Sequence, residues 1–197
     1  MKTRKFLTSF ISFVSILSFC LIPIHAQSSI DPDNDGIPGT NGIDYIIVHT
    51  EDIETEPYTP PEVTPNSLPG YSIRNVRHYG GGRKPFSISQ IGYPGGTISI
   101  SQTATIGLSY DTSFGFSVAD LSASLGFSVK SSYSTTLSYT YKVPSTHNGK
   151  KVKSAKLTPW LEYDMYSYDF YFLEAKTGSG IADKPIAIDY VVILTYA

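Results

Sequence analysis

Three carboxylates near the N-terminus come closest to a metal-binding motif. Asp31, Asp33 and Asp35 precede Gly36, which places oxygen ligands at positions 1, 3 and 5 and the turn-forming glycine at position 6 of a calcium loop. Position 12 is Gly42, where a calcium loop needs a bidentate glutamate. Two interpretations stay open, a weak Ca²⁺ site and an acidic, solvated tail.

No other group of residues has the spacing of a catalytic site. The candidate carboxylates for glycoside hydrolysis are Glu162, Asp164 and Asp169. The histidines beyond residue 26 are His49, His78 and His147. None of them accompanies a nucleophile motif or an HExxH sequence, and any β protein offers carboxylates along its strands. We therefore expect no enzymatic activity and no cofactor apart from the weak Ca²⁺ site.

The first 26 residues have the pattern of a secretory signal peptide. Residues 1–5 are basic, residues 6–24 are apolar apart from scattered Ser and Thr, and Ala26 is a small residue at the cleavage position. We expect cleavage after Ala26 and secretion, with an uncleaved membrane anchor as the alternative. Cleavage would remove Cys20, the only cysteine, so the secreted form would be stabilised without disulfides.

Composition and charge limit the class of protein to which the full chain can belong. Its 197 residues are 41% hydrophobic, 13% aromatic and only 16% charged, which suits one ordered domain. The net charge of -2 gives no reason to expect nucleic acid as a partner. Residues 27–70 are acidic and proline-rich and predict a linker or pro-segment, with one short strand at Tyr45–His49. Residues 71–197 then form the β domain.

The most regular pattern runs from Thr97 to Val143, where apolar and small polar residues alternate. A period of two predicts strands. The phase of the alternation switches at Ala119–Asp120, so a hairpin that pairs Val118 with Leu121 places all apolar side chains on one face. That face holds Ile98, Ile100, Ile106, Leu108, Phe114, Phe116, Val118, Leu121, Leu125, Phe127 and Val129. Either the ribbon is continuous, or it breaks at glycines into a compact sandwich.

These patterns predict an all-β protein, an elongated antiparallel sheet or sandwich with a long amphipathic hairpin. The alternation over 97–143, with its Ser/Thr-rich polar face, resembles the inserting β-hairpin of aerolysin-type (epsilon-toxin/mosquitocidal-toxin-like) pore-forming proteins. The resemblance implies a homo-oligomer and a barrel whose apolar face contacts lipid while the hydroxyl face lines water. The alternative is a non-lytic secreted or cell-surface binding or structural β-sandwich protein, whose core face alternates in the same way.

Four further segments carry predictions. The glycines of residues 80–82, beside Arg and Lys, indicate a turn or an anion site. Lysines around the loop at 144–149, notably Lys150, Lys151 and Lys153, either contact membrane lipid or a cell-surface polymer or are solvated edge residues. Seven aromatic residues between Trp160 and Phe172 favour strand packing over ligand stacking. Residues 176–180 predict a turn before a closing strand at 186–196.

Overall fold

The computed structural model describes residues 44–54, 69–112 and 116–197. The predicted signal peptide, the carboxylates Asp31, Asp33 and Asp35, and Phe114 lie outside the described residues. Within the described part, no helix is both long and apolar enough to cross a membrane.

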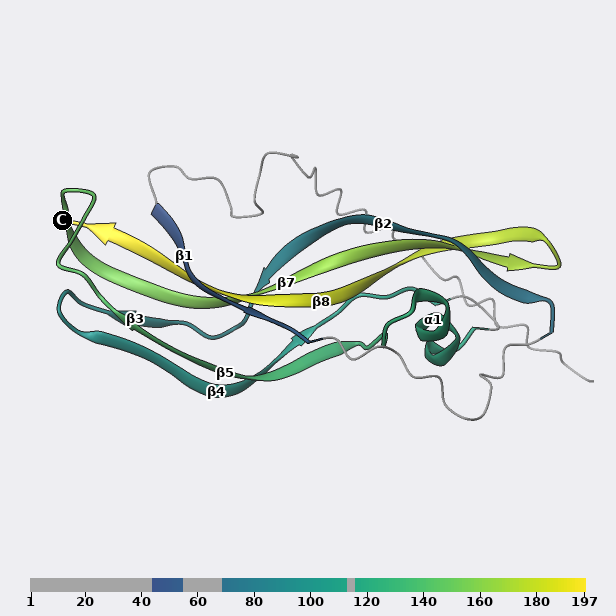
Figure 1. The fold of residues 1–197 in the computed structure, drawn as a ribbon, viewed down its shortest axis with the longest axis horizontal. Helices are drawn as coiled ribbons and strands as arrows, with labels where there is room; N and C mark the ends of the chain where they lie inside the picture. Colours follow the sequence, from purple (N-terminus) through teal and green to yellow (C-terminus); the bar gives the residue numbers. More distant parts are fainter. Residues whose placement is uncertain (1–43, 55–68, 113–115) are drawn as a thin grey trace, which may run out of the picture. The chain divides into compact units, whose positions relative to one another are not determined.

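The fold is all-β and antiparallel, as the sequence predicts. Its main sheet has six strands in the order β1-β8-β7-β2, with β3 and β6 also paired to β7 (Figure 1). The two long strands are β7 (Lys150–Phe172) and β8 (Ala175–Tyr196). Strands β2 (Tyr71–Pro85) and β3 (Gln90–Gly92) follow one another along the same edge of β7, and β6 (Thr146–His147) forms a short hairpin with its start.

The segment predicted as a linker contributes a strand to this sheet. Strand β1 (Asp44–Asp52) contains the predicted strand at Tyr45–His49 and pairs with β8 from Asp44↔Leu194 to Asp52↔Ala187. The sheet therefore includes residues on the N-terminal side of the predicted boundary at Tyr71.

A second sheet consists only of β4 (Thr97–Gly107) and β5 (Ser132–Lys142), here called the ribbon. Its register joins Thr97 to Lys142. The same register, extended toward the middle of the segment, would place Val118 opposite Leu121, as the sequence predicts. The predicted register is therefore confirmed for the two arms. The predicted hairpin turn at Ala119–Asp120 is wrong, because helix α1 (Val118–Leu125) occupies this position.

Local capping explains why the chain turns helical there. The Ser117 hydroxyl accepts a hydrogen bond from the Asp120 backbone N–H, and the Asp120 carboxylate accepts one from the Ser117 N–H at 2.7 Å. This capping box satisfies backbone donors of the first turn. The helix ends at Gly126 in the left-handed conformation. Val118, Leu121 and Leu125 also have the i, i+3, i+7 spacing of one helix face. The same apolar residues can therefore lie on one face of a helix or on one face of the predicted hairpin.

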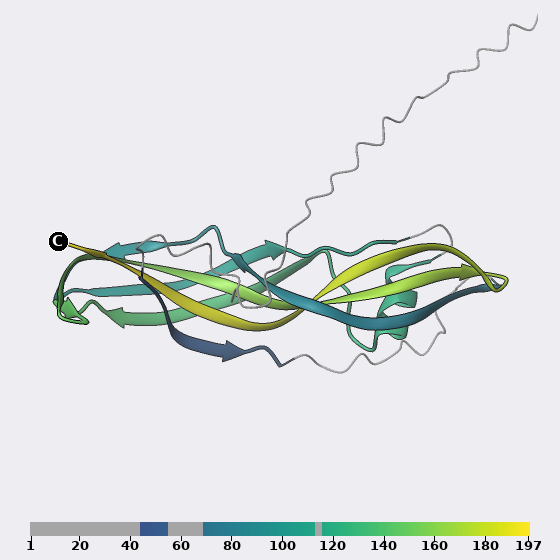
Figure 2. The same ribbon diagram turned by 90° about the horizontal axis from the view of Figure 1, so that it is seen from above.

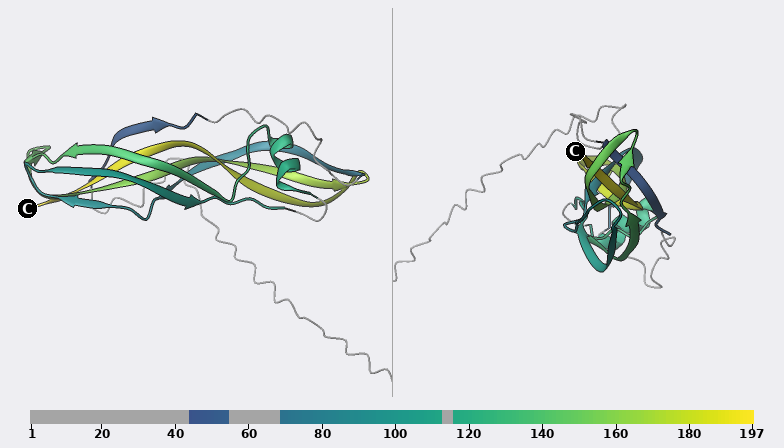
Figure 3. Two further views of the ribbon diagram at one scale, coloured as in Figure 1. Left: turned by 90° about the horizontal axis from the view of Figure 1, so that it is seen from below. Right: turned by 90° about the vertical axis from the view of Figure 1, so that its left-hand side faces the viewer.

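The hydrophobic core lies between the two sheets and continues under α1. Buried residues of β4 and β5 pack against β7 and β8, including Leu157, Leu161, Ile188 and Val192. A second cluster joins Leu121 of α1 and the following residues to the other half of these strands. Figures 2 and 3 show the ribbon along one half of β7 and β8, and α1 along the other.

Two predicted turns are wrong, and both segments are strands. Residues 176–180 belong to β8, because the β7–β8 turn falls at Leu173 and Glu174. The glycine run lies in β2. A Cβ atom at Gly82 would approach the Tyr163 hydroxyl to 2.7 Å, so glycine at this position leaves room for the tyrosine ring on the neighbouring strand.

Candidate functional site

The candidate functional site is the hairpin unit, residues 97–142, which comprises β4, the connection with α1, and β5. The predicted apolar face of the two arms is turned toward the six-stranded sheet. Ile98, Ile100 and Ile106 of β4 are buried, and Leu137 of β5 is fully buried. The strands pack against the larger sheet through side chains, while their backbone ladder is shared only with each other.

The outer face of the ribbon is a ladder of paired hydroxyls. The Oγ atoms of Ser99 and Thr140 lie 3.1 Å apart, and those of Thr105 and Ser134 lie 3.0 Å apart, both pairs exposed. The Leu108 N–H donates to Ser131 O, which sets the alternation of bonded and non-bonded pairs along the ladder. The hydroxyl pairs therefore fall at non-hydrogen-bonded positions, where side chains of opposite strands approach most closely. The ladder leaves this face polar with little charge.

The other predicted apolar residues belong to the connection rather than to a strand. Leu121, Phe127 and Val129 are buried against β7 and β8, Phe116 and Leu125 pack at the edge of the same cluster, and Leu108 packs on the ribbon core. Val118 is 37% exposed at the start of α1. All these residues except Val118 are thus covered in this conformation.

A short backbone contact joins the hairpin unit to the edge of β8. Tyr110 and Ala182 form an isolated antiparallel bridge, flanked by hydrogen bonds from Asp111 N to Ile181 O and from Asp183 N to Ser109 O, both 2.9 Å. The Asp183 carboxylate also accepts from the Ser109 N–H at 2.8 Å. Sequence reasoning missed this contact, although Asp111 stands out as an acid on a nearly uncharged face.

A second contact joins the ribbon to β8 and β1. The Ser138 N–H, at an outer edge of the ribbon, donates to the Tyr190 hydroxyl at 3.0 Å. Tyr139 stacks on His49 with 5.1 Å between ring centroids, and its hydroxyl donates to Val48 O at 3.3 Å. Strand β1 therefore holds both the edge of β8 and one arm of the ribbon.

Two buried groups at the first contact have raised pKa values. Burial raises the pKa of Tyr168 to about 12, so at neutral pH its hydroxyl donates to Asp111 O at 2.6 Å. Burial also raises the pKa of the Asp183 carboxyl, and the hydrogen bonds from Ser109 oppose that rise. The stability of the fold is therefore coupled to the protonation of Asp183.

We expect Asp183→Asn to remove part of the pH dependence of stability. The folded-state pKa of Asp183 lies above the unfolded value of about 3.9, so wild type gains stability as pH falls through the folded pKa and loses it as pH rises. The variant has no group to titrate at this position. Urea midpoints compared over roughly pH 3 to 7 should show the variant gaining on wild type as pH rises. A constant difference between the two proteins would contradict this coupling.

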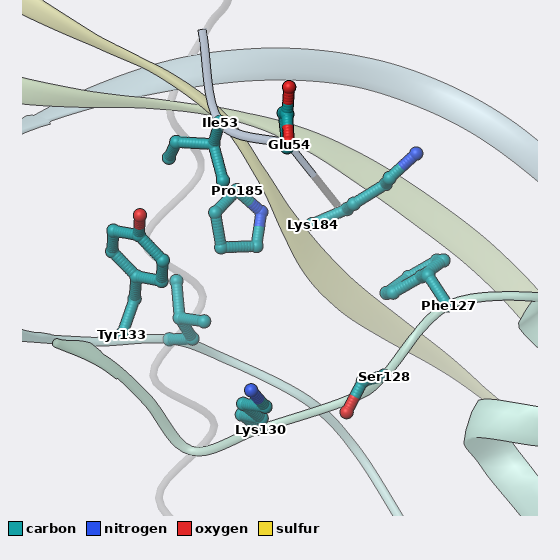
Figure 4. Close-up of a pocket in the computed structure, with 9 residues that line it drawn as sticks. Ile53, Glu54, Phe127, Ser128, Lys130, Tyr133, Lys184 and Pro185 are labelled. Atoms are coloured by element: carbon teal, nitrogen blue, oxygen red, sulfur yellow. The ribbon is translucent and has the colours of Figure 1, made fainter. Parts of the chain in front are cut away.

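A cavity of about 170 Å³ lies where the hairpin unit meets the main sheet (Figure 4). Pro185 and Ile53 come from the sheet side, while Tyr133 and Phe127 come from the hairpin unit. The Lys184 ammonium lies 5.8 Å from the centroid of the Phe127 ring. The pocket is partly open to solvent, and charged side chains such as Glu54 and Lys130 line it together with the apolar ones.

The remaining predicted residues do not converge on this site. Lys150, Lys151 and Lys153 are exposed at the β6–β7 hairpin. The three candidate carboxylates each have a separate cationic or imidazole partner: Glu162 with Arg83, Asp164 with His78, and Asp169 with Lys176. Among the described residues, no three His, Cys, Asp or Glu side chains are grouped to hold a metal ion.

The described residues thus define an all-β protein in which an amphipathic two-stranded ribbon covers a larger antiparallel sheet. Comparison with known proteins adds no relative, because neither the family models nor the curated proteins give a match to the chain.

Proposed function

We propose that this is a secreted, non-enzymatic, membrane-active protein that forms pores through the hairpin at 97–143. The observation that carries the proposal is the two-sided character of the ribbon. Its apolar face is covered by the main sheet through side-chain packing, and its outer face is a ladder of hydroxyls. Such a ribbon can exchange the sheet for lipid on one face while keeping water on the other.

The lengths and register of the arms support this exchange. Each arm has 11 residues, within the range of about 9–11 that a tilted strand needs to cross the hydrocarbon core. The paired register of β4 and β5 ends at Gly107 and Ser132, and the same register extended through the connection would pair Val118 with Leu121. Helix α1 has eight residues, too few to be stable once it leaves the sheet. The arms can therefore lengthen by converting α1 to strand without changing their register.

Assembly requires strand edges that can pair with another copy, and each arm of the ribbon has one edge that pairs with no other described strand. Undocking would also release the Ser138 N–H at the β5 edge from the Tyr190 hydroxyl. A two-stranded sheet has one edge on each side, and edges of this kind pair with strands of another copy. We therefore include a homo-oligomer in the proposal, with hydroxyl faces toward a water-filled lumen.

An engineered disulfide between residues 110 and 182 tests the proposal. The flanking hydrogen bonds make Tyr110 and Ala182 a non-hydrogen-bonded pair, with Cα atoms about 4.5 Å apart, which suits a disulfide. We expect oxidised Tyr110→Cys/Ala182→Cys, in residues 27–197, to release no dye from liposomes, and the reduced form to release it. Release that is equal in both redox states would refute insertion of this hairpin.

The matched control places the disulfide inside the ribbon. Thr103 and Thr136 face each other on the exposed side, with their Oγ atoms 3.2 Å apart. Oxidised Thr103→Cys/Thr136→Cys keeps the arms paired without tethering them to the main sheet. We expect it to release dye in both redox states.

The alternative function is a non-lytic secreted or cell-surface binding protein. The ends of the ribbon strands at Gly107 and Ser132 favour it, because the arms are not continuous in this conformation. A protein of this class would release no dye whether the disulfide is oxidised or reduced. The same experiment therefore separates the two functions.

A further inference from the structure

Two hairpins of this protein use the same tight turn with very different residues. Asn148 and Gly149 have φ values of 50° and 75°, and Leu173 and Glu174 have φ values of 44° and 69°. Both are two-residue connections with positive φ at both central positions, which is the type I′ turn. Asn-Gly is the preferred pair for this turn, whereas a leucine in the left-handed region is strained.

The strain at Leu173 is not compensated by burial of its side chain. Leu173 is 69% exposed, and the neighbouring Phe172 is 38% exposed. The backbone of the turn is held in place by a hydrogen bond from the Leu173 N–H to Gly70 O at 2.9 Å. An exposed leucine therefore occupies a left-handed backbone position that asparagine would adopt with less strain. Such an outlier points to a role of the leucine side chain itself.

Aromatic residues lie next to the Leu173–Glu174 turn, and two of them are tyrosines with a polar hydroxyl. Tyr71 packs on Phe172 with 4.7 Å between ring centroids, and Tyr171 lies two residues, or roughly 7 Å, behind Leu173. If Leu173 entered the apolar part of a bilayer, a tyrosine at this distance would lie at the level of the lipid headgroups, where tyrosine is enriched.

The basic side chains next to this turn are paired with acids. Arg74 donates to both Glu174 carboxylate oxygens at 2.5 and 2.6 Å, and Lys176 lies 2.7 Å from the Asp169 carboxylate. The hydrogen bonds from Arg74 hold the pKa of Glu174 below its usual value, so Glu174 is negatively charged at neutral pH and balances the charge of Arg74. The local charge is balanced, which suits a zwitterionic surface better than an anionic one.

We propose that the β7–β8 tip, residues 171–174, is a membrane-docking element that places Leu173 and Phe172 into the interface of a zwitterionic bilayer. This inference rests on the proposed function only in taking a bilayer as the target. It assigns first contact to a different hairpin from the one proposed to insert. Figure 1 shows this turn at the opposite end of β7 from the β6 hairpin that carries the exposed lysines.

The test measures binding without insertion. Oxidised Tyr110→Cys/Ala182→Cys is mixed with phosphatidylcholine vesicles, and the bound fraction is measured by co-sedimentation. We expect the Leu173→Asn substitution in this background to lower the partition coefficient about tenfold, from the loss of one apolar side chain to the interface. It should also raise the melting temperature, because asparagine tolerates the left-handed conformation. Ile91→Asn, at a residue 63% exposed on β3, should leave binding unchanged.

Several results would overturn the docking role. These are failure of the oxidised parent to bind phosphatidylcholine vesicles, equal binding by Leu173→Asn and its parent, or an equal loss in Ile91→Asn. Binding that appears only with anionic vesicles would assign contact to charged residues instead. Each of these results leaves the proposed function to be decided by dye release from the reduced protein.

Discussion

Leu137→Ala is expected to loosen the ribbon from the main sheet while leaving that sheet folded. Leu137 is fully buried on the inner face of β5. Truncating a buried leucine costs about 2–5 kcal/mol, through lost transfer energy and the cavity left behind. Because the ribbon shares no continuous backbone ladder with the main sheet, most of this cost falls on the equilibrium for undocking. Backbone amides of β4 and β5 should exchange hydrogen faster, and dye release should accelerate.

The matched variant is Leu161→Ala, which removes an equally buried leucine from β7. Leu161 lies in the middle of the main sheet, opposite Ile188 and Lys84, and its side chain belongs to the same core cluster as Leu137, so its loss weakens the main sheet as well as the packing of the ribbon. We expect this variant to unfold at lower urea with faster exchange in both sheets. If Leu137→Ala accelerates exchange in β7 and β8 as much as in the ribbon, undocking is not a separate step.

Asp189→Ala is expected to destabilise the fold by about 3–5 kcal/mol. Asp189 is 1% exposed, and its carboxylate accepts from Arg83 Nε at 2.8 Å and from the Thr50 hydroxyl at 2.7 Å. These bonds tie β2 and β1 to β8. Removing the carboxylate leaves the guanidinium of Arg83, whose side chain is 18% exposed, without its nearest acid. Denaturant unfolding at neutral pH measures the loss.

Asp189→Asn is the control for the charge at this position. The amide keeps the shape of the side chain and one acceptor oxygen, so the loss of stability should be smaller than for alanine. Hydrogen exchange should also rise in β1 for the alanine variant, since Thr50 loses its partner. Equal stability of Asp189→Ala and wild type would show that Glu162, 3.4 Å from Arg83, replaces Asp189.

The sequence predicts the strand content well because alternation is a local property. A period of two over 97–107 and 132–142 can bury one face only as strands, and its phase also determines which residues pair. The predicted register, carried out to Thr97 and Lys142, is the one that the ribbon adopts. The short strand predicted at Tyr45–His49 is also present within β1, although its pairing with β8 was not predicted.

The connection between the arms could not be predicted from periodicity alone. Val118, Leu121 and Leu125 fit one face of a helix as well as one face of a strand. The capping box between Ser117 and Asp120 is visible as a sequence pattern, but only packing of Leu121 against Tyr168 and Phe170 makes the helix the stable choice here.

Turn positions show the same division between local and long-range causes. Asn148–Gly149 is an ordinary turn signal, and the chain turns there. Leu173–Glu174 carries no turn signal, and the glycine-rich residues that follow it predict a turn that the structure places in β8. The long register of β7 against β8 decided this position, because shifting the turn would misalign every pair along the two strands.

By itself, the sequence determined the fold class, the two faces of the ribbon and the pairing of its arms, because each follows from alternation between neighbouring residues. Only the tertiary structure decided that the apolar face is covered, that α1 replaces the hairpin tip, and that Asp183, Tyr110 and Ala182 meet. These contacts join residues about 70 positions apart in the chain, and no local pattern specifies which distant surfaces fit together.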